Sequence, residues 1–192
     1  VAAMTGCRVE KHWVSKSRPG LTNHAMAAMV WEEMQGVGAP IWSEAGLKRA
    51  RQVQTACGMA GEADPLLEAC TQMIAPQEAE AILREALPPE QRNSTSDDYT
   101  DVSWHAPLAR FYVARPALKG GPYPAWAMNA LGGMPGTIDP MVETAARVMA
   151  RAALRVLTDE ALRKAAWAEF ETRTGGGVGG TDWIPPLADY AP

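Results

Sequence analysis

The chain has 192 residues, 47% of them hydrophobic, so it can bury a substantial core. Its 18 basic and 22 acidic residues give a net charge of −4 without a long block of either sign, which argues against nucleic acid or an anionic membrane surface as a partner. No apolar run approaches the roughly 20 residues that cross a bilayer, and the first residues lack the pattern of a signal peptide, so we expect a cytoplasmic location.

The first predicted elements are a strand and a helix. Residues 7–17 have apolar anchors at Val9, Trp13 and Val14 and end at an Arg-Pro-Gly breaker, which predicts a strand. Asn23 suits the N-cap of a helix whose apolar residues recur at i, i+3, i+4 and i+7: Ala27, Val30, Trp31 and Met34. Together they predict a compact α+β unit.

The middle of the chain is predicted to be mostly helical. Ser43 can cap a helix over 44–57, and Pro76 occupies a first-turn position of a helix that runs through Leu87. Residues 90–103 are polar and rich in turn formers, which predicts a loop.

Two short strands and two helices are expected in the last part of the chain. Residues 110–115 and 125–128 read as strands separated by a glycine-rich turn. Each of the helices, one from about Met141 and one after a Thr158 cap, carries an apolar stripe. The stripes are Val142, Ala145, Met149, Ala152 and Val156 in the first helix, and Leu162, Ala165, Ala166 and Phe170 in the second.

Metal-binding residues are few. The histidines are His12, His24 and His105, no two of them at i, i+4, so the chain alone is not expected to build a two-metal site. The densest polar cluster joins Asp98 and Asp101 to His105, with Asp97 beside them. These carboxylates can bind a divalent ion, or they can cap backbone N–H groups and shape the loop.

Two segments together resemble a known enzyme family. Residues 96–104, Ser-Asp-Asp-Tyr-Thr-Asp-Val-Ser-Trp, resemble the S-x-D-x-x-D-V-S-W segment of the aminobenzoyl-glutamate utilisation protein B branch of the two-metal aminoacylase and carboxypeptidase family. Residues 141–176 resemble the closing helices of that branch. These motifs belong to the carboxyl-terminal half of the family, so the resemblance implies half an enzyme.

The resemblance implies an α/β fold. Residues 1–40 would be the closing part of a small α+β lid or dimerisation domain, and residues 41–192 the second half of an aminopeptidase-like catalytic domain. The implied reaction is hydrolysis of an amide bond in an acyl- or aminobenzoyl-amino acid, assisted by a divalent metal such as Zn or Mn. The implied partners are that small amide substrate, a second copy of the chain, or a missing amino-terminal half.

The resemblance also implies positions for site residues. Asn23 matches a family asparagine that reaches the substrate across a dimer interface, although the N-cap role competes for the same amide. Arg18 and His24 are close enough in sequence to help bind a substrate carboxylate or an oxyanion. The residues expected to line the cleft are Asp98, Asp101 and Ser103.

Asp139 is the candidate metal ligand. It stands where the family has its last histidine ligand, and a carboxylate oxygen can replace an imidazole nitrogen on Zn or Mn. The alternative is a helix cap, because Asp139 directly precedes Pro140. Residues 122–126 lack the histidine and serine of the family's P-G-H-S-W segment. We therefore expect the chain alone to be inactive, and two alternatives stay open: a non-catalytic interaction or dimerisation protein, and the carboxyl-terminal subunit of a split enzyme.

Overall fold

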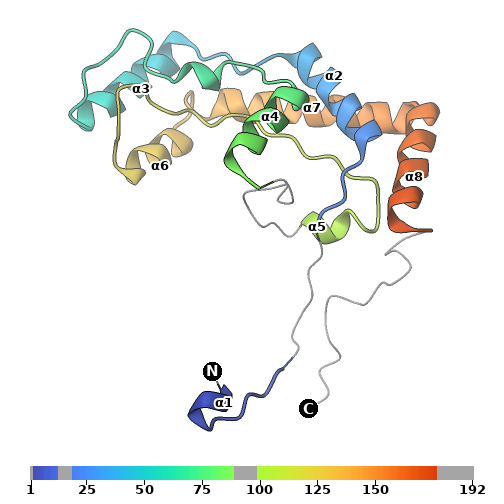
Figure 1. Ribbon diagram of the computed structural model, residues 1–192. Helices are drawn as coiled ribbons and strands as arrows, with labels where there is room; N and C mark the ends of the chain where they lie inside the picture. The colour runs from blue at the N-terminus through green and yellow to red at the C-terminus, as the bar shows by residue number, and fades with distance from the viewer. Residues whose placement is uncertain (1, 13–18, 89–98, 177–192) are drawn as a thin grey trace.

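The computed structural model describes residues 2–12, 19–88 and 99–176, and in these ranges the chain is helical (Figure 1). Helices α2, α7 and α8 pack together, helices α3 and α6 form a second packed region, and α1 lies apart from both. The helices are α1 (Ala2–Thr5), α2 (His24–Val37), α3 (Glu44–Ala56), the short 3-10 helix η1 (Glu68–Cys70), α4 (Pro76–Ala86), α5 (Tyr99–Val102), α6 (Ala125–Gly133), α7 (Asp139–Thr158) and α8 (Glu160–Thr174).

The expectation of an α/β fold is wrong. Within the described ranges there is no sheet, and the only β pairing is an isolated antiparallel bridge between Leu66 and Leu118. The described part of the first predicted strand, 7–12, and the second, 110–115, have no regular structure. The third, 125–128, is the first turn of α6.

The physical reason is that each predicted strand depended on a few apolar residues, and the described ranges of the chain offer it no partner strand. Short apolar runs fit a helix or an irregular segment as well as a strand. Ala125 and Met128 are good helix formers, and Pro124 stands at the N-cap of α6. In the 110–115 segment, the Arg110 guanidinium lies 4.5 and 4.4 Å from the ring centres of Tyr99 and Tyr112, so these side chains stack on one another.

Local capping rules placed most helix starts correctly. The Asn23 side chain accepts a hydrogen bond from the Met26 N–H at 3.0 Å, and Ser43 accepts one from Gly46 at 3.3 Å. Pro76 is in the first turn of α4, as predicted. The cap of α8 is Asp159 rather than Thr158, which ends α7.

Helix α2 packs across α7 and α8 around a small core of Met29, Val30 and Val148. An ion-pair network borders this core. The buried carboxylate of Glu33 accepts hydrogen bonds from Arg151 at 2.6 Å and from Arg155 at 3.1 Å. The predicted domain boundary near residue 40 falls just after α2, and α2 packs on helices from beyond that boundary. The domain division stays a prediction.

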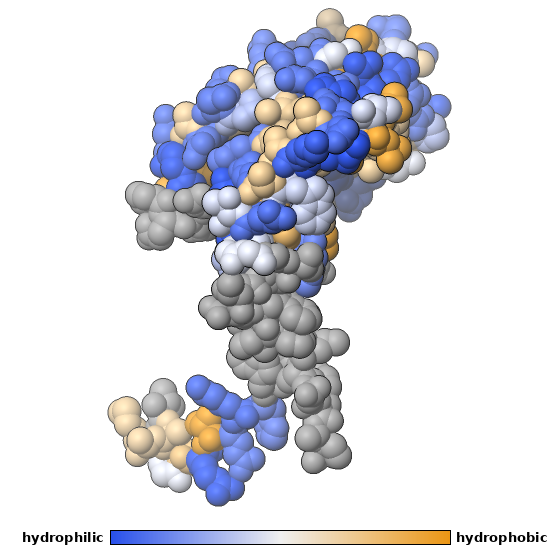
Figure 2. Space-filling view, turned by 90° about the vertical axis from the view of Figure 1, so that its right-hand side faces the viewer, coloured by the Kyte–Doolittle hydropathy of each residue, from blue (hydrophilic) through white to orange (hydrophobic). Residues whose placement is uncertain are grey.

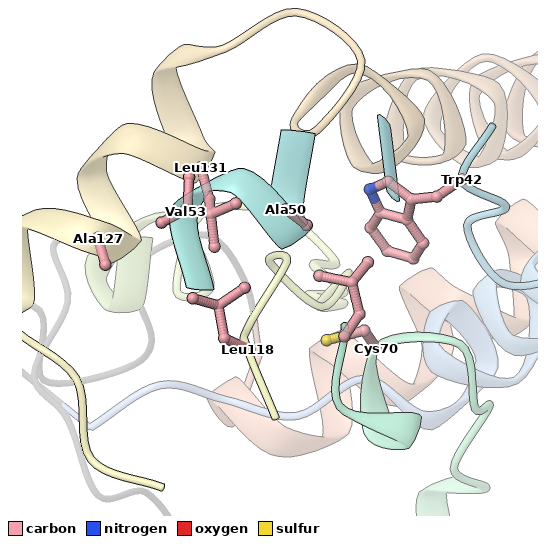
Figure 3. Packing of buried hydrophobic residues seen from close by; sticks show 8 residues of the cluster. Trp42, Ala50, Val53, Cys70, Leu118, Ala127 and Leu131 are labelled. Atoms are coloured by element: carbon pink, nitrogen blue, oxygen red, sulfur yellow. The ribbon is translucent and has the colours of Figure 1, made fainter. Parts of the chain in front are cut away.

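The second packed region surrounds α3 and α6 (Figure 3). The Trp42 indole N–H donates to the Thr137 carbonyl at 2.7 Å, which ties the start of α3 to the turn before α7. The buried residues of this cluster are Trp42, Ala50, Val53, Leu66, Cys70, Leu118, Ala127 and Leu131. Among the helices described, none combines the length and the apolarity needed to span a membrane.

Candidate functional site

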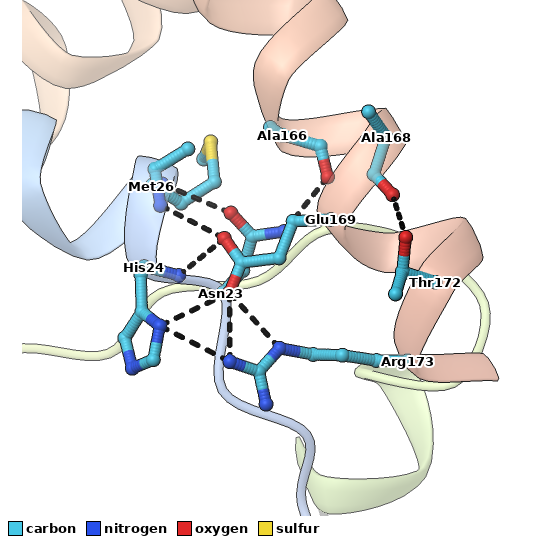
Figure 4. Close-up of polar contacts among 9 residues, drawn as sticks. Asn23, His24, Met26, Ala166, Ala168, Glu169, Thr172 and Arg173 are labelled. Carbon is cyan, nitrogen blue, oxygen red and sulfur yellow. Dashed lines mark hydrogen bonds and ion pairs between the residues drawn. The ribbon is translucent and has the colours of Figure 1, made fainter.

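The start of α2 is where several predicted site residues meet (Figure 4). Asn23 is 3% exposed, and both ends of its side-chain amide are engaged. Its oxygen caps α2 through the Met26 N–H, and its NH₂ group donates to the Ala166 carbonyl of α8 at 2.8 Å. The amide that the resemblance assigns to substrate contact therefore joins α2 to α8 in this structure.

Glu169 is the central acceptor of the same junction (Figure 4). One carboxylate oxygen accepts the backbone N–H groups of His24 at 2.7 Å and Ala25 at 3.1 Å, so α8 supplies a second cap for α2. The other oxygen accepts from Arg173 Nε at 2.9 Å. Burial raises the pKa of Glu169, but these hydrogen bonds outweigh burial and leave the pKa below its usual value.

His24 lies on the exposed side of this junction. Its Nδ1 is 3.1 Å from Arg173 Nη2 and 3.2 Å from Glu169 Oε1. The ring can accept from the guanidinium or donate to the carboxylate, depending on which nitrogen carries the proton. A substrate carboxylate at this junction would need a basic partner. The basic side chain beside His24 is Arg173, and it already forms an ion pair with Glu169. Sequence reasoning missed Glu169 and Arg173, although their i, i+4 spacing is a recognisable ion-pair signal.

Ser103 connects the α5 segment to the chain that enters α2. Its buried hydroxyl accepts the Leu21 N–H at 2.8 Å and donates to the Thr100 carbonyl at 2.5 Å. Asp101 lies at the end of the same short helix, where its backbone carbonyl accepts the Trp104 N–H at 3.1 Å. The structure therefore brings Asn23, His24 and Ser103 to one region, and their substrate-binding roles stay predictions.

The hollow between these elements is small. It is too narrow to admit even one water molecule. Pockets that hold small-molecule ligands usually measure about 300 Å³ or more. The residues that line it are Leu21, Thr22, Asn23, Ser103, Pro107, Leu108, Phe170 and Arg173. In this conformation the junction is a packed joint between α2, α5 and α8.

Asp139 lies at the other end of α7, near the α3 and α6 region (Figure 1). It is the first residue of α7, and its exposed carboxylate accepts the Gly136 N–H at 2.9 Å. The carboxylate therefore closes the turn before the helix, and it also lies at the positive end of the helix dipole. The N-cap position itself belongs to Ile138.

The remaining predicted site residues are Arg18 and Asp98, which lie outside the described residues together with Asp97. Where the chain is described, no group of three or more His, Cys, Asp or Glu side chains is arranged to hold a metal ion. The predicted ligand role of Asp139 stays a prediction.

A different feature appears on α7. Six apolar residues of this helix are exposed and fall within about 100° of arc along one side, and we call them the α7 stripe. They are Val142, Ala146, Met149, Ala150, Ala153 and Leu157. The buried side of the helix is a separate one, centred on Val148. Val142 and Met149, which belong to the apolar stripe predicted from the sequence, are 51% and 62% exposed.

The sequence contained a signal for this exposed side. Apolar residues occupy well over half of the circumference of α7, which is wider than the single stripe of a helix that packs on one surface.

Comparisons with protein-family models, with curated proteins and with solved structures gave no significant match.

Proposed function

We propose that this chain is an association protein that binds a partner helix through the α7 stripe. The observation that carries the proposal is that α7 keeps a second apolar side exposed after its first has packed against α2 and α8. An exposed apolar stripe along a helix is typical of a surface that another protein covers. Figure 2 shows hydrophobic side chains on the surface of the helical body among hydrophilic ones.

The expected contribution of the stripe is substantial. Val142, Met149 and Leu157 are 51%, 62% and 76% exposed. Complete burial of such a side chain contributes about 1.5–3 kcal/mol, so covering the exposed part contributes about 1–2 kcal/mol for each residue. The alanines between them leave room for another helix to approach closely. The stripe extends over about four turns, which is long enough for another helix to pack along it.

Helix α4 supports the same conclusion. Its apolar residues Ala79, Ile82, Leu83 and Ala86 share one side, while its charged residues occupy the other. None of its residues is buried, and Ile82 is 53% exposed. An amphipathic helix whose apolar side is uncovered is expected to pack against a surface other than those that α4 contacts in the described residues.

The test uses a photo-crosslinking residue, p-benzoylphenylalanine, in place of Met149, with Glu171 of α8 as the matched exposed control position. Irradiation of the producing cells and of the purified chain should give covalent adducts from position 149 and not from position 171. Any partner found in this way must then bind the purified chain and lose affinity in the Leu157→Glu variant. Absence of position-specific adducts in both settings would overturn the proposal.

A second candidate function is participation in metal-dependent amide hydrolysis, with this chain as the carboxyl-terminal subunit. The observation that favours it is the sequence of residues 96–104 together with that of residues 141–176. The partner would then supply most of the metal ligands and the catalytic base.

The assay for this candidate is hydrolysis of acyl-amino acids and aminobenzoyl-glutamate with added Zn²⁺ or Mn²⁺. We expect no turnover by the purified chain alone, and turnover after addition of a polypeptide that carries the missing ligands. In that complex, Asp139→Asn should weaken metal binding if Asp139 is a ligand, because a neutral amide is a poor substitute for a carboxylate. Unchanged metal affinity would assign Asp139 to the turn alone.

A further inference from the structure

We propose that the α7 stripe binds a second copy of the same chain, with the two α7 helices antiparallel about a twofold axis between Met149 and Ala150. This inference rests on the proposed association function and names its partner. It is carried by the spacing of the stripe and by the chemistry beside it, and the area that two such helices can bury sets the expected strength of the contact.

The spacing of the stripe is symmetric about its centre. Val142 lies seven residues before Met149, and Leu157 lies seven residues after Ala150. Ala146 lies three residues before Met149, and Ala153 lies three residues after Ala150. An antiparallel copy therefore places Val142 at the same level along the helix axes as Leu157, Ala146 at the level of Ala153 and Met149 at the level of Ala150. Such self-complementarity is what a twofold interface requires.

The packing of this arrangement is reasonable at each level. At the centre, Met149 and Ala150 lie on opposite edges of the stripe, so Met149 meets Met149 of the other copy across the twofold axis on one edge, where these flexible side chains can pack together, and Ala150 meets Ala150 on the other edge. Ala146 opposite Ala153 allows the helix backbones to approach closely on either side. At both ends, Val142 and Leu157, which are 51% and 76% exposed, lie side by side in the contact.

The residues beside the stripe fit an antiparallel pair. Glu143 and Arg147 border the same edge of the stripe as Leu154, which is 61% exposed. In an antiparallel pair, like edges meet, so Arg147 faces Leu154 of the other copy and Glu143 faces Thr158. The aliphatic stem of Arg147 can then cover Leu154 while its guanidinium stays in water. No like charges are opposed, and the two helix dipoles run in opposite directions.

The area sets the expected strength. A contact about four turns long and one helix wide buries roughly 400 Å² on each copy. Stable and specific interfaces bury about 1,200 Å² or more in total, so this contact corresponds to a weak dimer with a dissociation constant in the range of roughly tens to hundreds of micromolar.

The first experiment is sedimentation analysis of the full chain from micromolar to near-millimolar concentration. We expect a monomer–dimer equilibrium that Met149→Glu weakens at least about tenfold, because the change places a charge at the centre of the contact. Ile41→Glu, before α3, makes the same kind of change at an apolar position that is 86% exposed and lies outside the stripe, and it should leave the equilibrium unchanged. Circular dichroism of both variants verifies that the helices are retained.

The second experiment reads the direction of pairing by disulfide formation. The chain with Cys7→Ser and Cys57→Ser keeps only the buried Cys70, and Ala146→Cys and Ala153→Cys are introduced into separate samples. The antiparallel pair predicts a disulfide in the mixture of the two variants and not in either alone, since equivalent positions are about 10 Å apart along the axis. Linkage within the Ala146→Cys sample would indicate parallel helices and overturn the proposal.

Two further outcomes separate this inference from the proposed function. A chain that stays monomeric at all concentrations, but gives crosslinks from position 149 to a different protein, refutes the second copy and retains the association function. A dimer that Met149→Glu does not weaken is formed by another surface, and it refutes the α7 pairing. Absence of both dimer and crosslinks refutes both proposals.

Discussion

Arg151 donates from Nε to a carboxylate oxygen of Glu33 at 2.6 Å and thereby joins α7 to α2 across 118 residues of sequence. Arg155 donates to the other oxygen at 3.1 Å and also reaches Glu32 at 3.0 Å. The hydrogen bonds from Arg151 and then Arg155 hold the pKa of Glu33 below its usual value of 4.5, against the opposing effect of burial.

The first prediction concerns pH. A carboxyl group whose pKa is lowered by folding stabilises the fold above its usual pKa, and this contribution is lost as the pH falls through the lowered value. Glu33→Gln should therefore lower the thermal midpoint at neutral pH and approach the wild-type midpoint as the pH falls below 4.5. Glu32→Gln, at a mostly exposed side chain, should have a smaller effect. Parallel curves for Glu33→Gln and wild type at every pH would contradict the role assigned to Glu33.

The second prediction concerns the cap that α8 supplies to α2. Glu169→Ala removes the acceptor of the His24 and Ala25 N–H groups, so we expect a loss of about 1–2 kcal/mol in the free energy of unfolding. Glu171→Ala, at an exposed position of the same helix, should change it by less than about 0.5 kcal/mol. Chemical denaturation measures both, and equal effects would mean that the junction contributes little.

The third prediction separates the two ends of the Asn23 amide. Asn23→Ser keeps a capping oxygen but loses the bond to the Ala166 carbonyl, which should cost about 1 kcal/mol. Asn23→Ala also loses the cap and should cost about 2 kcal/mol in total. If neither variant is less stable than wild type, the amide is free for a role such as substrate contact.

The fourth prediction concerns a close approach of backbones. A Cβ at Gly46 would lie 2.3 Å from the Gly136 carbonyl oxygen, so Gly46→Ala should destabilise the chain although alanine favours helices. At Gly133 of α6, an added Cβ has no neighbour within 4 Å. Gly133→Ala should therefore be neutral or stabilising, by up to about 1 kcal/mol. Thermal melts of the two variants should move in opposite directions, and a stabilising Gly46→Ala would show that the contact is not made.

The fifth prediction concerns Asp139. Asp139→Ala removes the acceptor of the Gly136 N–H and a favourable charge at the start of α7, and it should cost about 1 kcal/mol. Asp139→Asn keeps an acceptor and should cost roughly half as much. Glu143→Gln on the same helix should have little effect, because its ion pair with Arg147 is long and exposed. If Asp139→Ala has the same free energy of unfolding as the wild type, the carboxylate of Asp139 does not stabilise the turn before α7.

Local chemistry decided which parts of the fold were predictable from sequence. Asn23, Ser43 and Pro76 mark helix starts because caps and first-turn prolines act within a few residues. The predicted strands failed because a strand depends on a partner from elsewhere in the chain, and a short apolar run does not reveal whether one exists. Residues 125–128 were assigned to a strand for this reason and form the first turn of α6.

In the candidate site, too, local features were predictable from the sequence and contacts with distant residues were not. The capping role of Asn23 was visible in the sequence, whereas its bond to Ala166 spans 143 residues and has no local signal. Periodicity identified the apolar residues of α7, but it does not show how many neighbouring elements are available to cover them. Val142 and Met149 fit the helical period of a core and are nevertheless exposed.

The joint between α2 and the last helices has a consequence for synthesis. Helix α2 is made before α7, and Glu33 meets Arg151 only after 118 further residues have been added. At ordinary rates of translation this interval is on the order of ten seconds. During that time Met29 and Val30 have no partner surface, whereas α7 and α8 can pair with each other as soon as both are made. The newly made chain therefore depends on α7 and α8 to shelter α2, and a ribosome that stalls before α7 would leave α2 open to chaperones.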